Sequence, residues 1–469
     1  MELFRKKSSV DQPLESKLTR NLTTPDLVFL GVGAIVGTGI FTVTGVGANQ
    51  WAGPALSLSF LIAAISVALS GLIFAEYSSR VPAIGGPYAF LFHTFGEFFG
   101  WIGGWLIILE FILAGSSAAT GWSGYVRGFV EAIGIHIPKA LSGAYNSANG
   151  TFVDLLAMLV TLTVTIIITR DAKKFLRFNS AMVLIKLFLI VLFILFGAFF
   201  INKANWQPFM PFGFFGEGHN TGVVAGSALM FFAYLGFESI SMAVEETKNP
   251  KKSIPRGILY SIGISTVLYI LVTIVLTGMV NYKKLGVNDP VAFAMRSVHQ
   301  PLLANIITAG AVVTLLTVLV SMIYGLSRLV YAIAKDGLLP KFLTKVNDTH
   351  HNPQNATIVI GVIALIFSGF IPLQTLAQVV NILTLTYLIL MAIGLIFIRK
   401  NETKAPVGTF VSPFYPVLPI LSILVSGYLM LQLSLDTWII FGILLLIGVI
   451  IYFAYGYKHS ILNEESEKS

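Results

Sequence analysis

The chain has 469 residues, of which 55% are apolar and only 11% are charged, and its formal net charge is +8. An ordinary soluble domain carries about 25% charged residues, so this composition excludes a soluble globular enzyme. The chain contains no cysteine, which excludes disulfides, thiolate chemistry and cysteine-bound metals.

Apolar stretches recur along the whole chain, and each is long enough to cross a hydrocarbon core of about 30 Å. They predict an all-α polytopic membrane protein with about twelve transmembrane helices. Residues 1–25 are polar and predict a cytoplasmic tail rather than a cleaved signal peptide. The expected spans are residues 26–50, 54–79, 97–129, 152–169, 178–201, 221–244, 257–280, 302–334, 355–371, 374–398, 414–433 and 436–456.

The positions of lysine and arginine predict the orientation in the membrane. If the N-terminus is inside, 23 of the 30 basic residues fall on inner segments and six on outer ones, with Lys186 left inside the fifth span. Inner loops of membrane proteins carry this excess of basic residues. We therefore expect both termini in the cytoplasm, and we read the net charge as a topology signal rather than a nucleic-acid surface.

Two of the spans contain residues that disfavour a continuous helix. The first reads LGVGAIVGTGIFTVTGVG, in which Gly37 and Gly39 flank Thr38. The sixth contains FFAYLGFES, in which Gly236 and Glu238 lie within the apolar run. Glycine lowers the cost of leaving helical geometry, so both spans are predicted to be broken. A packing seam of small residues is the alternative.

Spans 1 and 6 hold matching positions in a five-plus-five arrangement, and interrupted spans at matching positions are typical of inverted-repeat transporters. Unwound backbone at membrane depth is tolerated where it lines a cavity or is buried in protein. We expect a first repeat over 26–201, a second over 221–398, helices 11 and 12 over 412–457, and a cytoplasmic tail over 458–469.

Several motifs resemble those of the amino acid–polyamine–organocation transporters, and most of all the bacterial cationic amino acid transporter branch. They are GVGAIVGTGIF in span 1, PAIGGPYAF after span 2, SSAATGWSGY in span 3, YLGFES in span 6, EETKNPKKSIPRGI entering span 7 and YGLSRLVYAIAKDGLLP at the end of span 8. The likeness runs from about Asp26 to the C-terminus. The motifs identify the family when they are taken together, whereas each motif alone is weak evidence.

The resemblance implies substrate binding between broken helices 1 and 6. Family members hold the substrate carboxylate on backbone amides of the helix 1 break and the amino group on backbone carbonyls. The amides map onto Thr38 and Gly39, and the carbonyls onto Ile35, Phe232 and Leu235. Half-helix dipoles favour this orientation, because N-termini attract anions and C-termini attract cations. Phe232 also fits an aromatic lid, and Met322 of span 8 is a further expected substrate contact.

Ionisable residues at membrane depth are costly and therefore suggest function. The cationic branch carries an acidic residue resembling Glu110, which we expect to contact a cationic side chain; a structural hydrogen bond is the alternative. Glu238 is a candidate for gating or for helix packing. We expect solvated loop roles for Glu76 and Arg80 at the inner end of span 2.

Proton-coupled relatives resemble this chain in having a lysine on helix 5, whose ammonium replaces the sodium ion of sodium-coupled relatives. We therefore expect Lys186 to couple transport to protons by binding helix 1 carbonyls when charged and releasing them when neutral. Burial disfavours a charged amine, which suits such an exchange. A snorkelling lysine is the alternative.

The sequence therefore predicts a secondary active transporter of cationic or neutral L-amino acids, proton-coupled, in the bacterial plasma membrane. The rival hypotheses are a neutral amino-acid or polyamine exchanger of the same fold, and a membrane channel. No cofactor, metal or nucleic acid is expected, because the histidines lack metal-ligand spacing and no ATP-binding lysine motif occurs. The expected partners are the amino acid, protons and membrane lipids, and a small single-span subunit stays open.

Overall fold

The computed structural model describes residue 5 and residues 21–81, 86–147, 149–216, 221–243, 246–347, 352–401 and 409–466, without the side chains of 171–181, 241–242 and 464–466. Most of the predicted N-terminal tail and the last residues of the C-terminal tail lie outside these ranges. Regular structure within them is helical. The α-helices are α1 (Thr24–Ile35), α2 (Thr44–Gly47), α3 (Leu56–Arg80), α4 (Pro87–Phe95), α5 (Glu97–Ala132), α6 (Leu155–Gly197), α7 (Gly222–Met230), α8 (Ser239–Met242), α9 (Pro250–Met279), α10 (Pro290–Ser297), α11 (Pro301–Lys335), α12 (Gln354–Phe370), α13 (Leu373–Asn401), α14 (Val417–Leu431), α15 (Leu435–Ile451), α16 (Tyr457–His459) and α17 (Ile461–Ser466).

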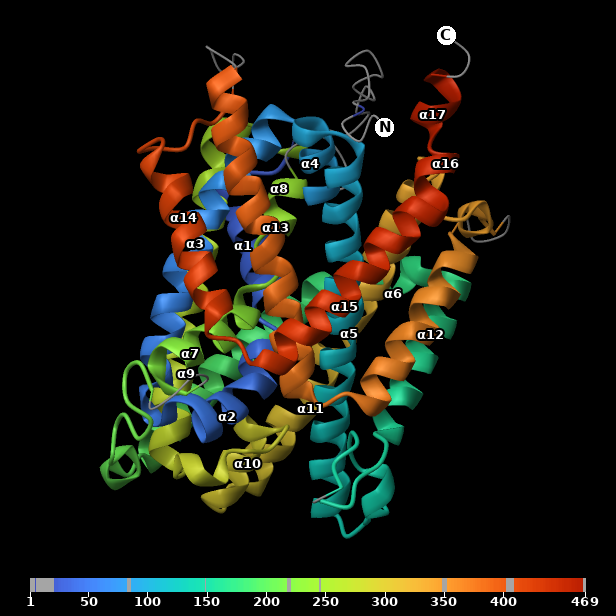
Figure 1. Cartoon of the computed structure of the whole chain (residues 1–469). Coiled ribbons are helices and arrows are strands. Elements are labelled where there is room, and N and C mark those ends of the chain that lie inside the picture. The colour runs from blue at the N-terminus through green and yellow to red at the C-terminus, as the bar shows by residue number, and fades with distance from the viewer. Residues whose placement is uncertain are drawn as a thin grey trace.

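The long helices stand together as one bundle (Figure 1). Among the described residues, seven helical stretches are long and apolar enough to cross a membrane, and five shorter apolar helices accompany them. Many large apolar side chains on their outer faces stay exposed, such as Leu184, Phe188 and Leu424. Lipid, rather than water, suits such a surface. The prediction of a polytopic helical membrane protein is confirmed.

Small residues allow the central helices to approach closely. Helix α5 packs against α11, α12 and α13, and Gly115 of α5 lies where an added Cβ would be 3.4 Å from the Cβ of Met322 on α11. Gly121 of α5 similarly abuts the side chain of Thr42. Glycine and other small residues commonly mediate helix packing in membranes, so the glycines of the third span are explained by helix contacts.

The fourth and fifth predicted spans belong to a single helix, α6, rather than to two helices. Its apolar parts are Leu155–Arg170 and Met182–Phe200. Basic residues between these parts suggested a loop. They do not end the helix, because lysine and arginine are good helix formers and neither glycine nor proline occurs before Gly197.

Two short helices lie in segments where the sequence predicted only loops. These are α4 between spans 2 and 3, and α10 between spans 7 and 8. Both begin with proline, at Pro87 and Pro290, which is favourable at the first helical position because its missing N–H has no helical partner there. Both helices are too short to cross a membrane, so the prediction from long apolar runs did not include them.

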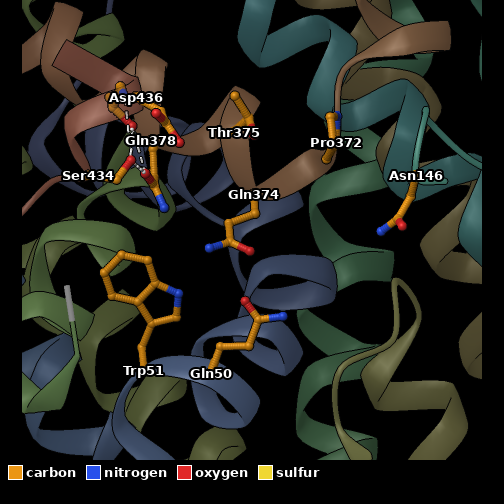
Figure 2. Close-up of a pocket in the computed structure, with 10 residues that line it drawn as sticks. Gln50, Trp51, Asn146, Pro372, Gln374, Thr375, Gln378, Ser434 and Asp436 are labelled. Atoms are coloured by element: carbon orange, nitrogen blue, oxygen red, sulfur yellow. Dashed lines mark hydrogen bonds between the residues drawn. The ribbon is translucent and has the colours of Figure 1, made fainter. Parts of the chain in front are cut away.

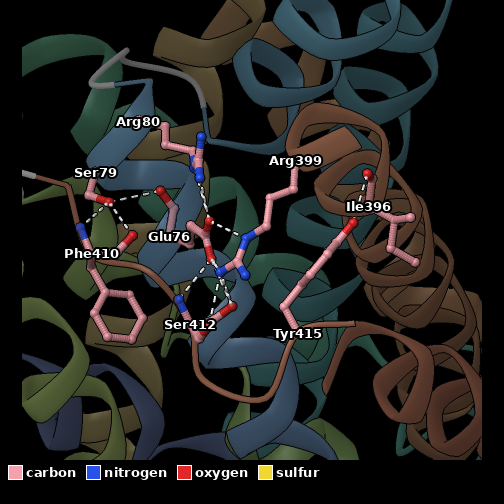
Figure 3. Close-up of polar contacts among 8 residues, drawn as sticks. All are labelled: Glu76, Ser79, Arg80, Ile396, Arg399, Phe410, Ser412 and Tyr415. Atoms are coloured by element: carbon pink, nitrogen blue, oxygen red, sulfur yellow. Dashed lines mark hydrogen bonds and ion pairs between the residues drawn. The ribbon is translucent and has the colours of Figure 1, made fainter. Parts of the chain in front are cut away.

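Glu76 is fully buried, which corrects the prediction of a solvated role (Figure 3). Its Oε1 accepts hydrogen bonds from Arg399 at 2.8 Å and Arg80 at 2.9 Å. Its Oε2 accepts from the backbone N–H of Ser412 at 2.8 Å, from the Ser412 hydroxyl at 2.7 Å, and from a second nitrogen of Arg399. This cluster joins the end of α3 to the end of α13 and to the segment that precedes α14.

The two described ends of the chain meet at one end of the bundle. Arg5 donates a hydrogen bond of 2.8 Å to Asn463 in α17, and its carbonyl accepts the backbone N–H of Glu97 at 2.9 Å. Nearby, the hydroxyls of Tyr452 and Ser460 donate to the buried Glu97 carboxylate. The segments next to both termini therefore lie on the same side of the bundle.

Candidate functional site

Helix 1 is broken at the position that the sequence predicts. Helix α1 ends at Ile35, the next residue, Val36, has φ −74° and ψ 103°, and helical backbone resumes at Thr38 before a π-helical turn over Gly39–Val43. The first amides of a helix have no partner within it. The N–H groups of Thr38 and Gly39 therefore stand at the start of the second half-helix, where the dipole favours an anion.

Helix 6 is broken as well. Helix α7 runs into a 3₁₀ turn over Phe231–Tyr234, and Gly236 then adopts φ +106°, a conformation that other residues rarely take. An added Cβ at Gly236 would lie 2.8 Å from the backbone carbonyl of Ala34, so this glycine also permits close contact with helix 1. The Glu238 carboxylate accepts the N–H of Gly236 at 3.0 Å and thereby stabilises the turn.

The two breaks touch each other. An added Cβ at Gly39 would collide with the Cα and Cβ of Ala233 in helix 6. The Tyr269 hydroxyl of α9 lies 3.0 Å from the carbonyl oxygen of Ile35 and 2.8 Å from that of Ala233. A hydroxyl has a single proton to donate, so at any moment Tyr269 can donate a full hydrogen bond to only one of these two carbonyls. Because a larger side chain at Gly39 would collide with Ala233, glycine is required here for the contact between helices 1 and 6, independently of any role in substrate binding.

Lys186 reaches helix 1 from α6. Its side chain is buried, and its ammonium donates to the carbonyl of Gly33, two residues before α1 ends. An added Cβ at Gly33 would meet Val183 of α6, so glycine lets the two helices approach here. Among the described residues, Lys186 forms no ion pair. The predicted contact between this lysine and a helix 1 carbonyl is present, and its part in coupling stays a prediction.

Glu110 of α5 is buried with only 2% of its surface exposed. Tyr387 and Thr384 of α13 are polar neighbours of its carboxylate, and its Oε2 has no hydrogen-bond partner among the described residues. The Glu238 carboxylate is near enough to repel it when both are charged. A buried carboxylate oxygen without a donor is costly, so this site is suited to receive a proton or a cation.

Of the remaining predicted contacts, all but Met322 are buried. Phe232 is 5% exposed, Leu235 is 9% exposed and Thr38 is 5% exposed, while Met322 is half-buried on α11. The Thr38 hydroxyl oxygen is buried without a hydrogen-bond partner among the described residues. The Phe232 carbonyl accepts the Leu235 N–H at 3.4 Å, a long bond within the turn. The region between the breaks is therefore closed and retains unsatisfied polar groups.

Three polar side chains of the site were missed from the sequence. Besides Tyr269 and Tyr387, Asn381 of α13 donates to the carbonyls of Ala228 at 2.7 Å and Leu229 at 3.1 Å, just before helix 6 breaks. Each of the three lies inside a long apolar span, as in VVNILTLTYL. A polar residue in that position usually has a partner across a helix interface, and this signal could have identified them.

Comparison with known proteins places these features in a family. A profile of the family described as amino acid permease matches residues 22–452. The chain is 42% identical over 465 residues to the methylthioribose transporter of Bacillus subtilis (strain 168), which covers 98% of this chain and 99% of that protein. It is 41% identical over 469 residues to the branched-chain amino acid permease BcaP of the same organism, with the same coverage.

More distant similarity extends to animals. The chain is 32% identical over 410 residues to the human cationic amino acid transporter 4, which covers 86% of this chain and 64% of that protein. All these relatives are permeases or transporters rather than enzymes, in agreement with the composition.

Proposed function

The chain belongs to the amino acid permease family, and from this premise we propose that it is a proton-coupled secondary active transporter of amino acids in the bacterial plasma membrane. It would work by alternating access, with repeats over 26–201 and 221–398 rocking about a central site and with both termini in the cytoplasm. The contact between the two broken helices, Gly39 on Ala233 and Gly236 on Ala34, supports this proposal most directly.

The backbone at the breaks suits the groups that every amino acid shares. The amides of Thr38 and Gly39 would bind the substrate carboxylate, and the carbonyls of Ile35, Phe232 and Leu235 would bind its ammonium. Because Tyr269 now donates to the Ile35 carbonyl, the incoming ammonium would compete with this hydroxyl. Binding would thus loosen the contact between the helices 1 and 6 that Tyr269 bridges.

Selectivity for the substrate side chain would come from Glu110, Phe232 and Met322. The relatives named for branched-chain and for cationic amino acids share the same family, so the family by itself does not choose between these substrates. The unpartnered oxygen of Glu110 favours a cationic side chain, since a charge-assisted hydrogen bond would satisfy it. We propose cationic substrates first and neutral ones second, with the latter served by a protonated Glu110 or a water.

Coupling would run through Lys186. When charged, its ammonium makes a charge-assisted hydrogen bond to Gly33 and ties α6 to the first half of helix 1. When it gives its proton to water on one side of the membrane, the bond loses its charge assistance and weakens, so that α1 can move. Reprotonation from the other side would restore the contact, so one proton would cross per cycle.

Uptake into proteoliposomes tests the coupling. We expect labelled L-lysine to enter under an imposed pH gradient, acid outside, equally with and without sodium. Lys186→Ala should lose this uptake, whereas Lys203→Ala, which removes an exposed lysine, should keep it. Uptake that follows a sodium gradient and ignores the pH gradient would overturn the proposed coupling.

Counterflow separates a carrier from a channel. Unlabelled L-lysine inside the vesicles should accelerate the entry of labelled L-lysine through a carrier, because the loaded site returns faster than the empty one. A pore shows no such stimulation. Unaccelerated entry would therefore favour the channel over the transporter.

A further inference from the structure

A polar cavity of 460 Å³ lies apart from the helix breaks (Figure 2). Gln50 and Trp51 line it from the π-helical turn over Ala48–Ala52, where helix 1 ends, and Gln374 and Gln378 line it from the start of α13. Asp436 lines it from the first turn of α15. Thr38 and Trp51 are separated by 13 positions, which corresponds to about 20 Å of helix. A solute in this cavity therefore would not touch the break.

Gln378 presents an amide donor to the cavity that no described residue accepts. Its side chain is 4% exposed, and its amide oxygen accepts hydrogen bonds from the hydroxyls of Ser434 at 2.9 Å and Thr437 at 2.7 Å. Its amide nitrogen has no partner among the described residues. Figure 2 shows Gln374, Gln50 and Trp51 around the space next to this amide. This amide nitrogen is therefore available as a donor to an acceptor that binds in the cavity.

The charges around the cavity define what it attracts. Among the described residues that line it, Asp436 is the single charged one, and none is lysine, arginine or histidine. A carboxylate without a basic neighbour attracts a cation, while the amide donors suit a carboxylate. The buried Trp51 ring offers an apolar face against which an aliphatic stem or an ammonium can pack.

We propose that this cavity is a second, outer binding site for amino acids with a cationic side chain. This inference rests on the proposed function, because it assumes that such solutes are the substrate and that the cavity faces outward. Asp436 takes the cationic side chain, and the amides of Gln378 and Gln374 take the carboxylate. The site collects substrate on the outside before the central site opens.

The walls of the cavity link the outer site to the breaks. Trp51 belongs to the half of helix 1 that begins at Thr38, and Gln378 precedes Asn381, which binds the helix 6 carbonyls at Ala228 and Leu229. A solute that bridges Trp51 and Gln378 therefore joins the outer end of helix 1 to the helix that contacts helix 6. Its release is expected to accompany the movement of these helices.

Thiol labelling tests the site directly, because the chain has no cysteine of its own. In purified full-length protein, Thr375→Cys, which lines the cavity without a binding role in the proposal, is labelled with a maleimide with and without L-lysine. Tyr145→Cys, an exposed position, serves as the matched control. We expect L-lysine to slow labelling several-fold at Thr375→Cys, L-glutamate to slow it less, and neither to affect Tyr145→Cys. Adding Asp436→Asn should abolish the protection by L-lysine.

The outcomes separate this inference from the proposed function. Protection that survives Asp436→Asn and is half-maximal at the same L-lysine concentration as uptake would reflect closure around the central site, and would overturn the outer site. Absent protection in a protein that still transports L-lysine would overturn the outer site alone. Protection that depends on Asp436, in a protein without uptake, would support the outer site and overturn the proposed transport.

Discussion

Two buried glutamates, Glu76 and Glu110, lie in apolar spans but in very different surroundings. Glu76 receives hydrogen bonds from two arginines and from both the backbone and the hydroxyl of Ser412, so that each of its oxygens has donors. Among the described residues, Glu110 has the uncharged Tyr387 and Thr384 as polar neighbours, and no donor bonds to its Oε2. Both side chains are almost fully buried.

The difference distinguishes a structural carboxylate from one that is available for binding. A buried charge is stable in a protein when an opposite charge and enough donors surround it. Glu76 meets this condition through its own neighbours and ties three segments together. Glu110 meets this condition only when a bound proton or cation partners its carboxylate. A substrate-binding site requires such an available group.

Glu76→Gln should have the largest effect. The substitution leaves Arg399, which is 11% exposed, without its counter-charge, and breaking a buried ion pair costs about 3–5 kcal/mol. We expect a marked loss of thermal stability in detergent. Glu110→Gln is the matched control, and it should change stability much less, because no described cation loses its partner there. Equal losses in the two variants would contradict the distinction between the two glutamates.

Glu110→Gln should instead alter substrate binding. A hydrogen bond to a charged group contributes about 1.5–3 kcal/mol, so L-lysine affinity should fall by roughly 10- to 100-fold, since 1.4 kcal/mol is a factor of ten. L-Alanine affinity should change little. Titration of the purified protein with both amino acids measures the contrast. Equal weakening for both would assign Glu110 a structural role.

Removing a single uncharged donor from each glutamate should have the smallest effect. Ser412→Ala deletes one hydroxyl donor to Glu76, and Tyr387→Phe deletes one near Glu110; each should cost about 0.5–1.5 kcal/mol of stability. Only Tyr387→Phe should also change L-lysine affinity, because it leaves Glu110 more dependent on the substrate for a partner. A change in L-lysine affinity in Ser412→Ala, measured by the same titration, would show that the two regions are coupled.

The sequence alone determined the membrane architecture and the location of the breaks. Long apolar runs insert as helices because of their local composition, and glycine at Gly37, Gly39 and Gly236 weakens helix formation wherever it occurs. Lys186 could be singled out because an ionisable residue within a span is rare. These features depend on neighbours along the chain, so they can be read without knowing which helices pack together.

The tertiary structure alone decided the partners of the polar groups. Glu76 and Arg399 are separated by 323 positions, and Tyr269 meets the two breaks only because α9 packs against both. The cavity at Gln378 likewise depends on elements far apart in the sequence. A polar residue in an apolar helix indicates that a hydrogen-bond partner is needed. The packing of the helices determines which residue becomes that partner. It therefore also determines whether the polar residue stabilises the fold or remains available to a substrate.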